Sequence, residues 1–308
     1  MNPYLSAPSV RAALRALHLH PTRGMGQHFL VDPHALQQIV AAAELAPNDV
    51  VVEVGPGLGV LTWELIHRAG QVVAIELDKR LASRLREELV GRTVVPFDVI
   101  QGDVLRCPPA VILEQAGVLE GRWSDIQDVS YLVVANLPYA ITSPVLRHFL
   151  EHSPQPRRIV VLVQWEVAQR ITAAPGKLSV LTHAIQMYAR PEVVGRVRAT
   201  SFLPQPAVDS AILRLEVRPA PAVEVDDTRA FFQVIKAGFL HPRKKLSNAL
   251  PGGLAALQNR VERAGVVAAL HTAGVSPDRR AETVTLEEWA AVYAALARDV
   301  FQCYHAHS

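Results

Sequence analysis

The chain has 308 residues, of which 50% are hydrophobic and 19% are charged, and its formal net charge is +2. This is the composition of a soluble globular protein, long enough for one large domain and a smaller one. No run of about 18 apolar residues and no secretory leader is present, and the two cysteines, Cys107 and Cys303, form no framework of spacings; these observations exclude a membrane span, a disulfide scaffold and a structural zinc site, and they predict a cytoplasmic protein.

The first 30 residues are predicted to form an N-terminal extension and a loop that leads into the body of the protein. A short helix is expected over Ser9–Leu17 and a loop over Gly24–Leu30. Asp32 has the sequence context of an N-cap and Pro33 that of a first helical residue, because a carboxylate can accept the free amides of a first turn. A helix with one apolar face should therefore follow.

Strands and helices alternate over the next part of the chain. Strands are predicted over Val50–Val54, Gln71–Glu76, Val94–Gln101, Leu132–Ala135 and Arg158–Gln164. Helices are predicted over Leu58–Ala69, after Asp78, and over Val145–Glu151, Trp165–Ala173 and Leu178–Tyr188. The strands are nearly continuous apolar runs, so both faces of the sheet must be covered, which predicts an α/β fold with a mostly parallel sheet. Glu192–Arg198 and Ala211–Glu216 are expected to pair as an antiparallel edge.

The pattern changes around Arg218-Pro219-Ala220-Pro221. Beyond this segment only helical periodicities occur, as in Phe231–Phe239, Val266–Ala273 and Leu286–Ala297. We therefore predict three parts: the extension with its loop (1–30), a cofactor-binding domain (31–219) and a helical domain (220–308).

Positive charge is concentrated in the predicted helical domain. Between Lys236 and Arg280 there are eight Lys/Arg and two Asp/Glu, whereas the rest of the chain carries 23 Lys/Arg and 27 Asp/Glu. A basic C-terminal third beside a slightly acidic body fits a polyanion-binding attachment. On charge alone, a solvated helical face explains the observation equally well.

A glycine turn follows the first predicted strand of the sheet. Gly55, Gly57 and Gly59 are spaced two apart, and glycine suits such a turn because its backbone adopts unusual dihedral angles and no side chain blocks a ligand. A dinucleotide fingerprint would require glycine at position 60, which is Val60 here. The turn therefore favours S-adenosylmethionine, which has no phosphate, over a dinucleotide.

Two acidic residues follow the next strands of the predicted sheet. Glu76 ends a strand about 20 residues after the turn, where an acidic residue binds ribose hydroxyls in nucleotide-binding α/β folds. Asp103 follows the third strand and is predicted to accept a hydrogen bond from the adenine amino group of the cofactor. Taken alone, each would more simply be a capping or turn residue; together with the glycine turn they indicate an adenosyl cofactor.

The tetrapeptide Asn136-Leu137-Pro138-Tyr139 follows the fourth predicted strand. Methyl transfer to the N6 amine of adenine requires a delocalised lone pair to be aimed at the methyl carbon, and acceptors for both amine hydrogens favour this. The Asn136 side-chain oxygen and the Leu137 carbonyl can supply these acceptors, since Pro138 restricts the residue before it. Tyr139 can stack on a base taken out of its helix. An isolated tetrapeptide would be an ordinary turn, but after the cofactor motifs it predicts N6 methylation without a general base.

The twelve histidines do not predict a metal site. The segment from His148 to His152 matches a His-x-x-Glu-His pattern of metalloproteases, but it ends a short predicted helix and no third ligand is evident. His305 and His307 lie near Cys303 at the end of the sequence. We therefore expect no metal cofactor.

With these motifs the chain resembles the ribosomal RNA adenine N6,N6-dimethyltransferases, in particular the kasugamycin-resistance type that acts on small-subunit rRNA. The similarity covers about residues 23–290. The segments that carry it are Gly26-Gln27-His28-Phe29-Leu30, Glu53–Gly59, Asn136–Pro144, Ser201–Ser210, Phe239–Asn248 and Arg280-Ala281-Glu282.

The resemblance implies a seven-stranded, mostly parallel Rossmann-like methyltransferase sheet with a small C-terminal all-helical domain. It implies cofactor contacts from His28, Leu30, Gly55, Gly57, Glu76, Asp103 and Asn136. It also implies transfer of two methyl groups to each of two neighbouring adenines near the 3′ end of small-subunit (16S) rRNA. The expected partner is rRNA within an immature 30S particle, bound by a monomer.

Three basic residues and one aromatic residue are predicted to contact the RNA. Arg243, Lys244 and Lys245 form a compact positive cluster that would bind phosphates, which gives affinity rather than base choice. Phe202 can stack on the target adenine opposite Tyr139, although a lone aromatic residue lies in a core equally often.

The chain departs from the family pattern at four places. They are His28 in place of Asn, Trp165 in place of Lys, a shortened loop over 174–179, and Pro242 in place of an Arg. The last three concern RNA docking more than the chemistry.

Other functions compete with this assignment, and one of them, a DNA adenine methyltransferase, is disfavoured by the resemblance alone. A large-subunit rRNA adenine dimethyltransferase of the macrolide-resistance type would share the turn and the tetrapeptide, but the basic Phe239–Asn248 segment favours the small-subunit type. A non-catalytic RNA-binding assembly factor is the other alternative, and the intact Glu76 and Asp103 argue against it.

Overall fold

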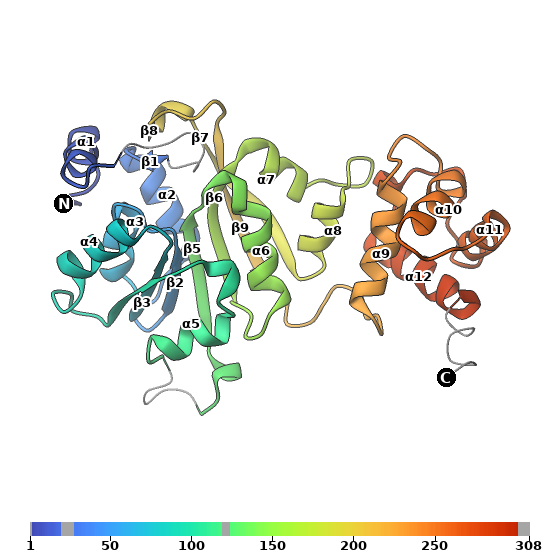
Figure 1. The fold of residues 1–308 in the computed structure, drawn as a ribbon, viewed down its shortest axis with the longest axis horizontal. Coiled ribbons are helices and arrows are strands. Elements are labelled where there is room, and N and C mark those ends of the chain that lie inside the picture. Colours follow the sequence, from blue (N-terminus) through green and yellow to red (C-terminus); the bar gives the residue numbers. More distant parts are fainter. Residues whose placement is uncertain (1, 20–27, 119–123, 301–308) are drawn as a thin grey trace. The chain divides into compact units, whose positions relative to one another are not determined.

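Two compact units make up the chain in the computed structural model (Figure 1). The structure describes residues 2–19, 28–118 and 124–300, the last three without their side chains. The first unit comprises Met1–Gln169 with Ala189–Val217, and the second comprises Arg170–Tyr188 with Arg218–Ser308. The segment Arg170–Tyr188 thus groups with the C-terminal residues, whereas the sequence analysis assigns it to the cofactor-binding domain.

A seven-stranded sheet forms the centre of the first unit, in the order β4-β3-β2-β5-β6-β9-β7. Its strands are β2 (Val50–Val54), β3 (Gln71–Glu76), β4 (Phe97–Gln101), β5 (Tyr131–Asn136), β6 (Arg158–Gln164), β7 (Ala189–Val197) and β9 (Ser210–Val217). The strands from β4 to β6 are parallel, and β9 is antiparallel to both β6 and β7. The predicted parallel sheet and its antiparallel edge are confirmed.

The strand order reverses between β2 and β5. From β2 the sheet continues through β3 to β4, whereas from β5 it continues through β6. The register pairs Glu53 with Val134, so the turn after β2 and the turn after β5 leave the sheet side by side. Ligands of open α/β sheets bind at such a reversal, beyond the carboxyl ends of the strands.

Helices pack against the sheet because its strands are apolar on both faces. The helices that follow or precede these strands are α2 (Pro33–Ala43), α3 (Val60–Ile66), α4 (Lys79–Leu89), α5 (Pro109–Gln115), α6 (Thr142–Glu151) and α7 (Trp165–Ile171). Val51, Val72 and Leu132 form a core cluster with side chains of α2, α3 and α4. The alternate residues Val52 and Val73 are also fully buried, as expected for a sheet covered on two sides.

The predicted N-terminal helix forms and packs beside the glycine turn. This helix, α1 (Ala7–Ala16), buries Val10 and Leu14 in a small cluster with Leu58 and Leu81. Its apolar face therefore packs against Leu58, which follows the glycine turn, and against Leu81 of α4.

A short two-stranded sheet holds the segment that follows. β1 (Phe29–Leu30) pairs antiparallel with β8 (Phe202–Leu203). Asp32 then caps α2, as predicted, by accepting hydrogen bonds from the first-turn amides. Gly26 and Gln27 of the predicted loop lie outside the described residues.

The second unit is helical. Its helices are α8 (Val180–Gln186), α9 (Thr228–Phe239), α10 (Leu246–Ala256), α11 (Arg263–Thr272) and α12 (Leu286–Val300). Phe231 and Trp289 are fully buried in its core. Met187 belongs to the same cluster, which explains why Arg170–Tyr188 groups with this unit. α9 and α10 pack closely at Gly253, where an added Cβ would lie only 2.1 Å from the Ala237 carbonyl oxygen.

Candidate active site

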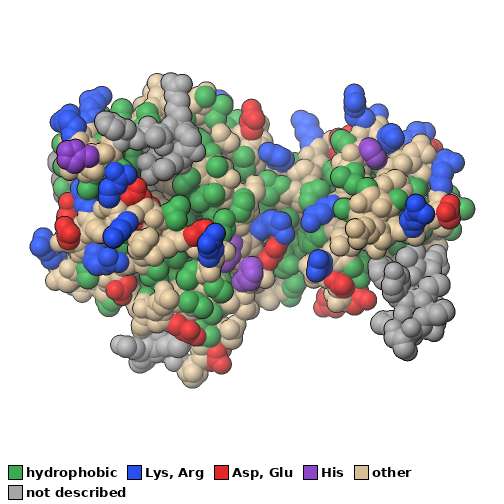
Figure 2. All heavy atoms as spheres, in the orientation of Figure 1, with side chains coloured by type: hydrophobic (Ala, Val, Ile, Leu, Met, Phe, Trp, Pro, Cys, Tyr) green, Lys and Arg blue, Asp and Glu red, His purple; other side chains and the backbone are tan. Residues whose placement is uncertain are grey.

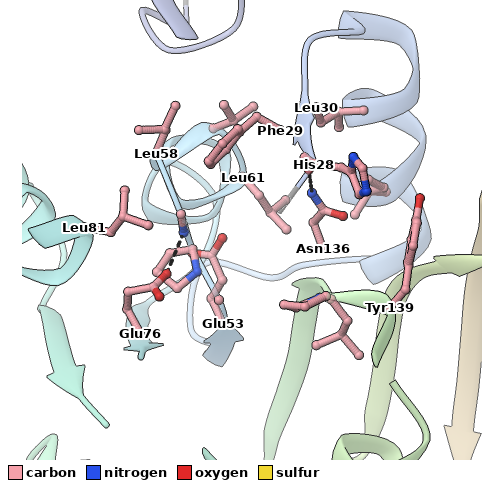
Figure 3. Close-up of a pocket in the computed structure, with 17 residues that line it drawn as sticks. His28, Phe29, Leu30, Glu53, Leu58, Leu61, Glu76, Leu81, Asn136 and Tyr139 are labelled. Carbon is pink, nitrogen blue, oxygen red and sulfur yellow. Dashed lines mark hydrogen bonds between the residues drawn. The ribbon is translucent and has the colours of Figure 1, made fainter. Parts of the chain in front are cut away.

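A cavity lies at the reversal of strand order, between the turn after β2 and the turn after β5 (Figure 3). Its walls come from the segment around β1, from the glycine turn with the ends of β2 and β3, and from the tetrapeptide after β5. The lining residues are His28, Phe29, Leu30, Ile39, Glu53, Gly55, Pro56, Gly57, Leu58, Val60, Leu61, Glu76, Leu81, Asn136, Leu137, Pro138 and Tyr139. The structure thus brings every predicted cofactor residue except Asp103 into one cavity.

Asp103 lies in a second cavity that shares Gly55, Glu76 and Pro138 with the first. One Asp103 carboxylate oxygen accepts the Leu105 amide at 3.0 Å, which caps a short 3-10 helix. Its Oδ2 lies 3.6 Å from Arg106 Nε, and its side chain is 39% exposed. The two cavities together form a cleft across the carboxyl ends of β2, β3, β4 and β5.

The glycine turn requires glycine for its backbone and for its close contacts. Gly55 and Gly57 have φ angles of 66° and 58°, in the left-handed region. A Cβ on Gly57 would lie 3.2 Å from the Phe29 ring, and one on Gly55 would lie 3.7 Å from the Pro138 ring. The turn therefore presents backbone, rather than side chains, at the cleft, and the Gly55 and Gly57 amides donate to Ile75 and Glu76.

Glu76 is fixed at the end of β3 by two backbone amides. Its Oε2 accepts from the Gly57 amide at 3.0 Å and its Oε1 accepts from the Asp78 amide at 2.9 Å. The residue is 6% exposed. Burial raises the pKa of Glu76, and the amides of Asp78 and Gly57 oppose this rise. Both oxygens keep a further lone pair for ligand hydroxyl groups.

Glu53 is a site residue that the sequence analysis did not single out. It is 1% exposed, lines the same cavity, and its Oε2 has no hydrogen-bond partner among the described residues. Burial, with a contribution from the negative charge of Glu76, raises the pKa of Glu53 to about 8. Thr62 lowers the pKa of Glu53 and offsets this rise only in part. The available signal was a charged residue within the otherwise apolar β2.

The orientation of the Asn136 amide follows from its hydrogen bond. Asn136 Nδ2 donates to the His28 carbonyl oxygen at 3.0 Å. A backbone carbonyl only accepts, so the nitrogen must face it and Oδ1 must point the other way. Figure 3 shows this amide between His28 and the cleft. Asn136 Oδ1 is thus a fixed acceptor for a ligand donor.

The remaining residues of the tetrapeptide form a firm edge of the cavity. Leu137 is 2% exposed, and no described residue donates a hydrogen bond to its carbonyl oxygen. The Tyr139 hydroxyl lies 2.8 Å from Ser210 Oγ, and this hydrogen bond restricts the orientation of the Tyr139 ring. Burial raises the pKa of Tyr139, so the phenol stays neutral at physiological pH. Two carbonyl-type acceptors and one aromatic ring therefore lie together at this edge.

His28 lines the cavity, whereas Phe202 is buried in the core. The His28 ring stacks on Tyr139, with centroids 5.4 Å apart and an angle of 29°, while its Nδ1 lies 2.8 Å from the Pro204 carbonyl oxygen. Phe202 is 4% exposed and packs in the main core cluster. A base could contact Phe202 only if this ring left the core.

The predicted RNA-binding cluster precedes α10 in the helical unit, whose surface carries Lys and Arg side chains (Figure 2). Arg243 and Lys244 are exposed, and neither forms an ion pair with another described residue. Lys245 pairs with Asp278 at 2.9 Å. In the described parts of the chain, no helix has the length and apolar character to cross a bilayer, and no group of three His, Cys, Asp or Glu side chains could hold a metal ion.

Comparisons with known proteins bear on the chemistry of this cleft. Residues 21–298 match the family described as ribosomal RNA adenine dimethylase. A Dehalococcoides mccartyi protein named ribosomal RNA small subunit methyltransferase A is 44% identical over 271 residues, which are 88% of this chain and 87% of that protein.

Two solved structures are also similar. The 23S rRNA methyltransferase ErmE has a TM-score of 0.62 and 31% identity, and the match covers 87% of this chain and 99% of that chain. A dimethyladenosine transferase from Plasmodium falciparum shares the fold, with a TM-score of 0.67 and 23% identity over 89% of this chain and 98% of that chain. The chain therefore belongs to the ribosomal RNA adenine dimethylase family, and its predicted assignment as an adenine methyltransferase is confirmed.

Proposed function

We propose that the protein transfers methyl groups from S-adenosylmethionine to N6 of two adjacent adenines near the 3′ end of small-subunit rRNA, and dimethylates each. The observation that carries the proposal is the orientation of the Asn136 amide. Its nitrogen donates to the His28 carbonyl, which leaves its oxygen free to accept a hydrogen bond in the cavity that Glu53 and Glu76 also line. The choice of the small subunit is supported by the relative named ribosomal RNA small subunit methyltransferase A.

The residues of the cleft fit S-adenosylmethionine. Glu76 offers two oxygens, already oriented by backbone amides, to the ribose hydroxyls. Glu53 has an orphaned buried oxygen that suits the cationic methionine end. Asp103, in the adjoining cavity, suits the adenine amino group. When bound, the cofactor supplies an electrophilic methyl carbon on a sulfonium.

The other predicted cofactor contacts have more limited roles in this proposal. The Gly55 and Gly57 positions allow close approach of the backbone, and Leu30 is a buried apolar part of the wall. His28 contributes its carbonyl oxygen, which positions Asn136. The His28 ring faces Tyr139, so it borders the target base as well as the cofactor.

The tetrapeptide holds the target amine in this proposal. Asn136 Oδ1 and the Leu137 carbonyl oxygen accept the two N6 hydrogens, and Pro138 fixes the direction of that carbonyl. Each accepted hydrogen favours a lone pair on nitrogen that points at the electrophile. Tyr139 stacks on the adenine after it leaves its helix. The proton of the product ammonium passes to water, so no general base is required.

The RNA track and the state of the protein belong to the same proposal. The exposed Arg243 and Lys244, with Lys245 beside them, bind rRNA phosphates within an immature 30S particle. The protein acts as a monomer in the cytoplasm. Phe202 can stack on the target base only if its buried ring moves out of the core.

A second candidate is dimethylation of a large-subunit adenine. It is favoured by the 31% identity with the 23S rRNA methyltransferase ErmE, against which stands 44% identity with the small-subunit relative. Because the two share the chemistry, only the position of the product separates them.

Two measurements test the proposal. Tritium transfer from labelled S-adenosylmethionine to immature small subunits should be well above background, and transfer at background would favour a non-catalytic assembly factor. A primer-extension stop should then be lost near the 3′ end of 16S rRNA in a strain without the protein. A stop lost in 23S rRNA instead would establish the large-subunit candidate.

A further inference from the structure

A tryptophan and an arginine form a stacked pair next to the tetrapeptide. Trp165 opens α7 directly after β6, and Arg196 lies near the end of β7. The Arg196 guanidinium carbon is 4.7 Å from the centroid of the Trp165 ring. Arg196 is thus backed on one side by an aromatic face.

Asp209 fixes the orientation of the Arg196 guanidinium. Arg196 Nε and Nη2 lie 2.9 Å and 2.8 Å from Asp209 Oδ2. Asp209 Oδ1 accepts the Ala199 amide at 2.9 Å, and the Asp209 carbonyl accepts the Trp165 amide at 3.0 Å. The Ala199 amide, together with Arg196, lowers the pKa of Asp209, so the carboxylate stays charged. The position of the pair is therefore fixed by backbone as well as by side chains.

The pair lies beside the tyrosine of the active site. Asp209 precedes Ser210, whose hydroxyl lies 2.8 Å from the Tyr139 hydroxyl. Gln164, the residue before Trp165, pairs with Ser210 across β6 and β9. A chain of direct contacts therefore leads from the stacking ring of the site to Arg196.

The outer side of Arg196 is open. Its side chain is 57% exposed. Asp209 bonds one edge of the guanidinium and the Trp165 ring lies over one face, so the opposite face is the one left for a ligand. Nucleobases of single-stranded RNA stack on guanidinium planes as they do on aromatic rings. A purely structural ion pair uses the charge and the two donors that bond Asp209, and its loss would lower stability. A stacking site also needs the open face of the guanidinium plane, and its loss would weaken substrate binding.

We propose that Trp165 and Arg196 form a platform on which the nucleobase next to the target adenine stacks. This inference rests on the proposed function. Two adjacent adenines are to be methylated, and while one is at Tyr139 the other must be held elsewhere. The platform holds that neighbour, and the two bases exchange places between rounds of transfer.

The test compares two Arg→Lys substitutions on the same strand. Arg196→Lys keeps the charge and removes the plane, and Arg190→Lys makes the same change at the opposite end of β7. Arg190 is exposed and lies at the end of β7 that pairs near Glu216, away from the carboxyl ends of the parallel strands. For each variant, methyl transfer to unmethylated small subunits gives KM and kcat, and calorimetry gives the affinity for S-adenosylmethionine.

We expect Arg196→Lys to raise KM for the particle about tenfold, the effect of one lost base stack, with kcat and cofactor affinity within twofold of wild type. Trp165→Leu should do the same, because the guanidinium loses its support. A particle with an abasic nucleotide beside the target should raise KM for the wild type but not further for Arg196→Lys. Arg190→Lys should match the wild type.

A wild-type KM for Arg196→Lys, or an equal change in Arg190→Lys, would overturn the platform while leaving transfer itself intact. A lower melting temperature with unchanged KM would assign the pair a structural role only. Failure of the wild type to transfer any label would instead remove the proposed function.

Discussion

In the proposed function, the chemistry depends most on the side-chain amide of Asn136. Its nitrogen is held by the His28 carbonyl at 3.0 Å, so its oxygen has one orientation before any ligand arrives. Such preorganisation costs no rearrangement at the moment of reaction, and for this reason single acceptors or donors in active sites have large effects on rate.

Replacement of Asn136 should separate binding from catalysis. We expect Asn136→Ala to lower the rate of transfer about 100-fold or more, the usual effect of one preorganised group, and to leave the affinity for S-adenosylmethionine within about threefold. Single-turnover transfer and calorimetry would measure the two quantities. Asn136→Asp should also be slow, because a carboxylate cannot donate to the His28 carbonyl. Equal losses of affinity and rate would contradict this division of roles.

Glu53 predicts a pH dependence of cofactor binding. Its pKa is raised to about 8, mainly by burial, so below pH 8 the free protein holds it protonated. If it must ionise to bind the cationic end of the cofactor, binding releases a proton, and affinity should rise as pH increases from 6 to 8 and then level off. The limiting slope is about tenfold per pH unit.

Calorimetry in buffers of different ionisation enthalpy would count the released proton. Glu53→Gln should bind more weakly and lose this slope, because the amide does not titrate. A slope that persists in Glu53→Gln would assign the proton to another group.

The sequence motifs that have a physical mechanism predicted residues that the structure places around one cavity. The glycine turn, Glu76 and the tetrapeptide each combine a backbone position with a chemical demand, and the structure brings them together. Glu53 was not predicted, because a strand pattern shows that a position is buried but not that a buried carboxylate lacks a partner. The stacking of His28 on Tyr139 was also not predictable, since it joins positions 111 apart in sequence.

At the scale of elements, prediction succeeded for strongly periodic segments. The buried strands and the caps of α2 and α4 follow from local sequence. α5 (Pro109–Gln115) was missed; it begins at the pair Pro108-Pro109 and has no side-chain N-cap to mark its start. Residues 170–188 were assigned to the cofactor-binding domain, whereas the structure groups them with the helical unit. Helical periodicity does not reveal which core a helix joins, and only the structure shows Met187 in the core of the helical unit.

The contact between α9 and α10 should be intolerant of any side chain at position 253. A Cβ there would lie 2.1 Å from the Ala237 carbonyl oxygen, which is backbone and cannot turn aside. We expect Gly253→Ala to destabilise the protein by about 1–3 kcal/mol, the usual cost of overpacking, measured by urea denaturation. Gly252→Ala, whose added Cβ would meet only the edge of His241 at 3.9 Å, is the matched control and should be neutral or stabilising by up to about 1 kcal/mol, because Ala is favoured over Gly inside a helix. Equal destabilisation at the two positions would show that the contact with Ala237 is not responsible.

The segment before α10 should contribute salt-dependent affinity. Neutralising Arg243, Lys244 and Lys245 to Gln should weaken binding to small subunits and lower the slope of log affinity against log salt by about 2–3. We expect Lys245 to contribute least, because it pairs with Asp278. Unchanged affinity in filter binding across a salt series would remove this cluster from the RNA track.

At the scale of the whole molecule, the chain passes between its two units three times. It leaves the first unit after Gln169, returns at Ala189 and leaves again after Val217. A boundary drawn at a single position in the sequence therefore cuts through the helical unit, although the change of pattern near residue 220 is real.

This connectivity predicts the result of truncation. A chain ending at residue 219 should keep the sheet but expose Met187 and break the hydrogen bond between His183 Nε2 and the Val284 carbonyl. We expect its melting temperature to fall by about 5–10 °C, as for a loss of 2–3 kcal/mol. A second truncation that also replaces residues 172–188 by a flexible linker of equal length should recover part of this loss in calorimetry. A second truncation no more stable than the first would show that the exposed helix is not the cause.

The hydrogen bond from Asn136 to His28 also governs when the enzyme can first work during its synthesis. His28 reaches its position through the pairing of β1 with β8, which ends at Leu203. A nascent chain that has already completed β5 thus possesses the tetrapeptide but not its alignment. Translation must proceed beyond residue 203 before this pairing can form, so we expect shorter nascent chains to be unable to modify the ribosomal particles that surround them.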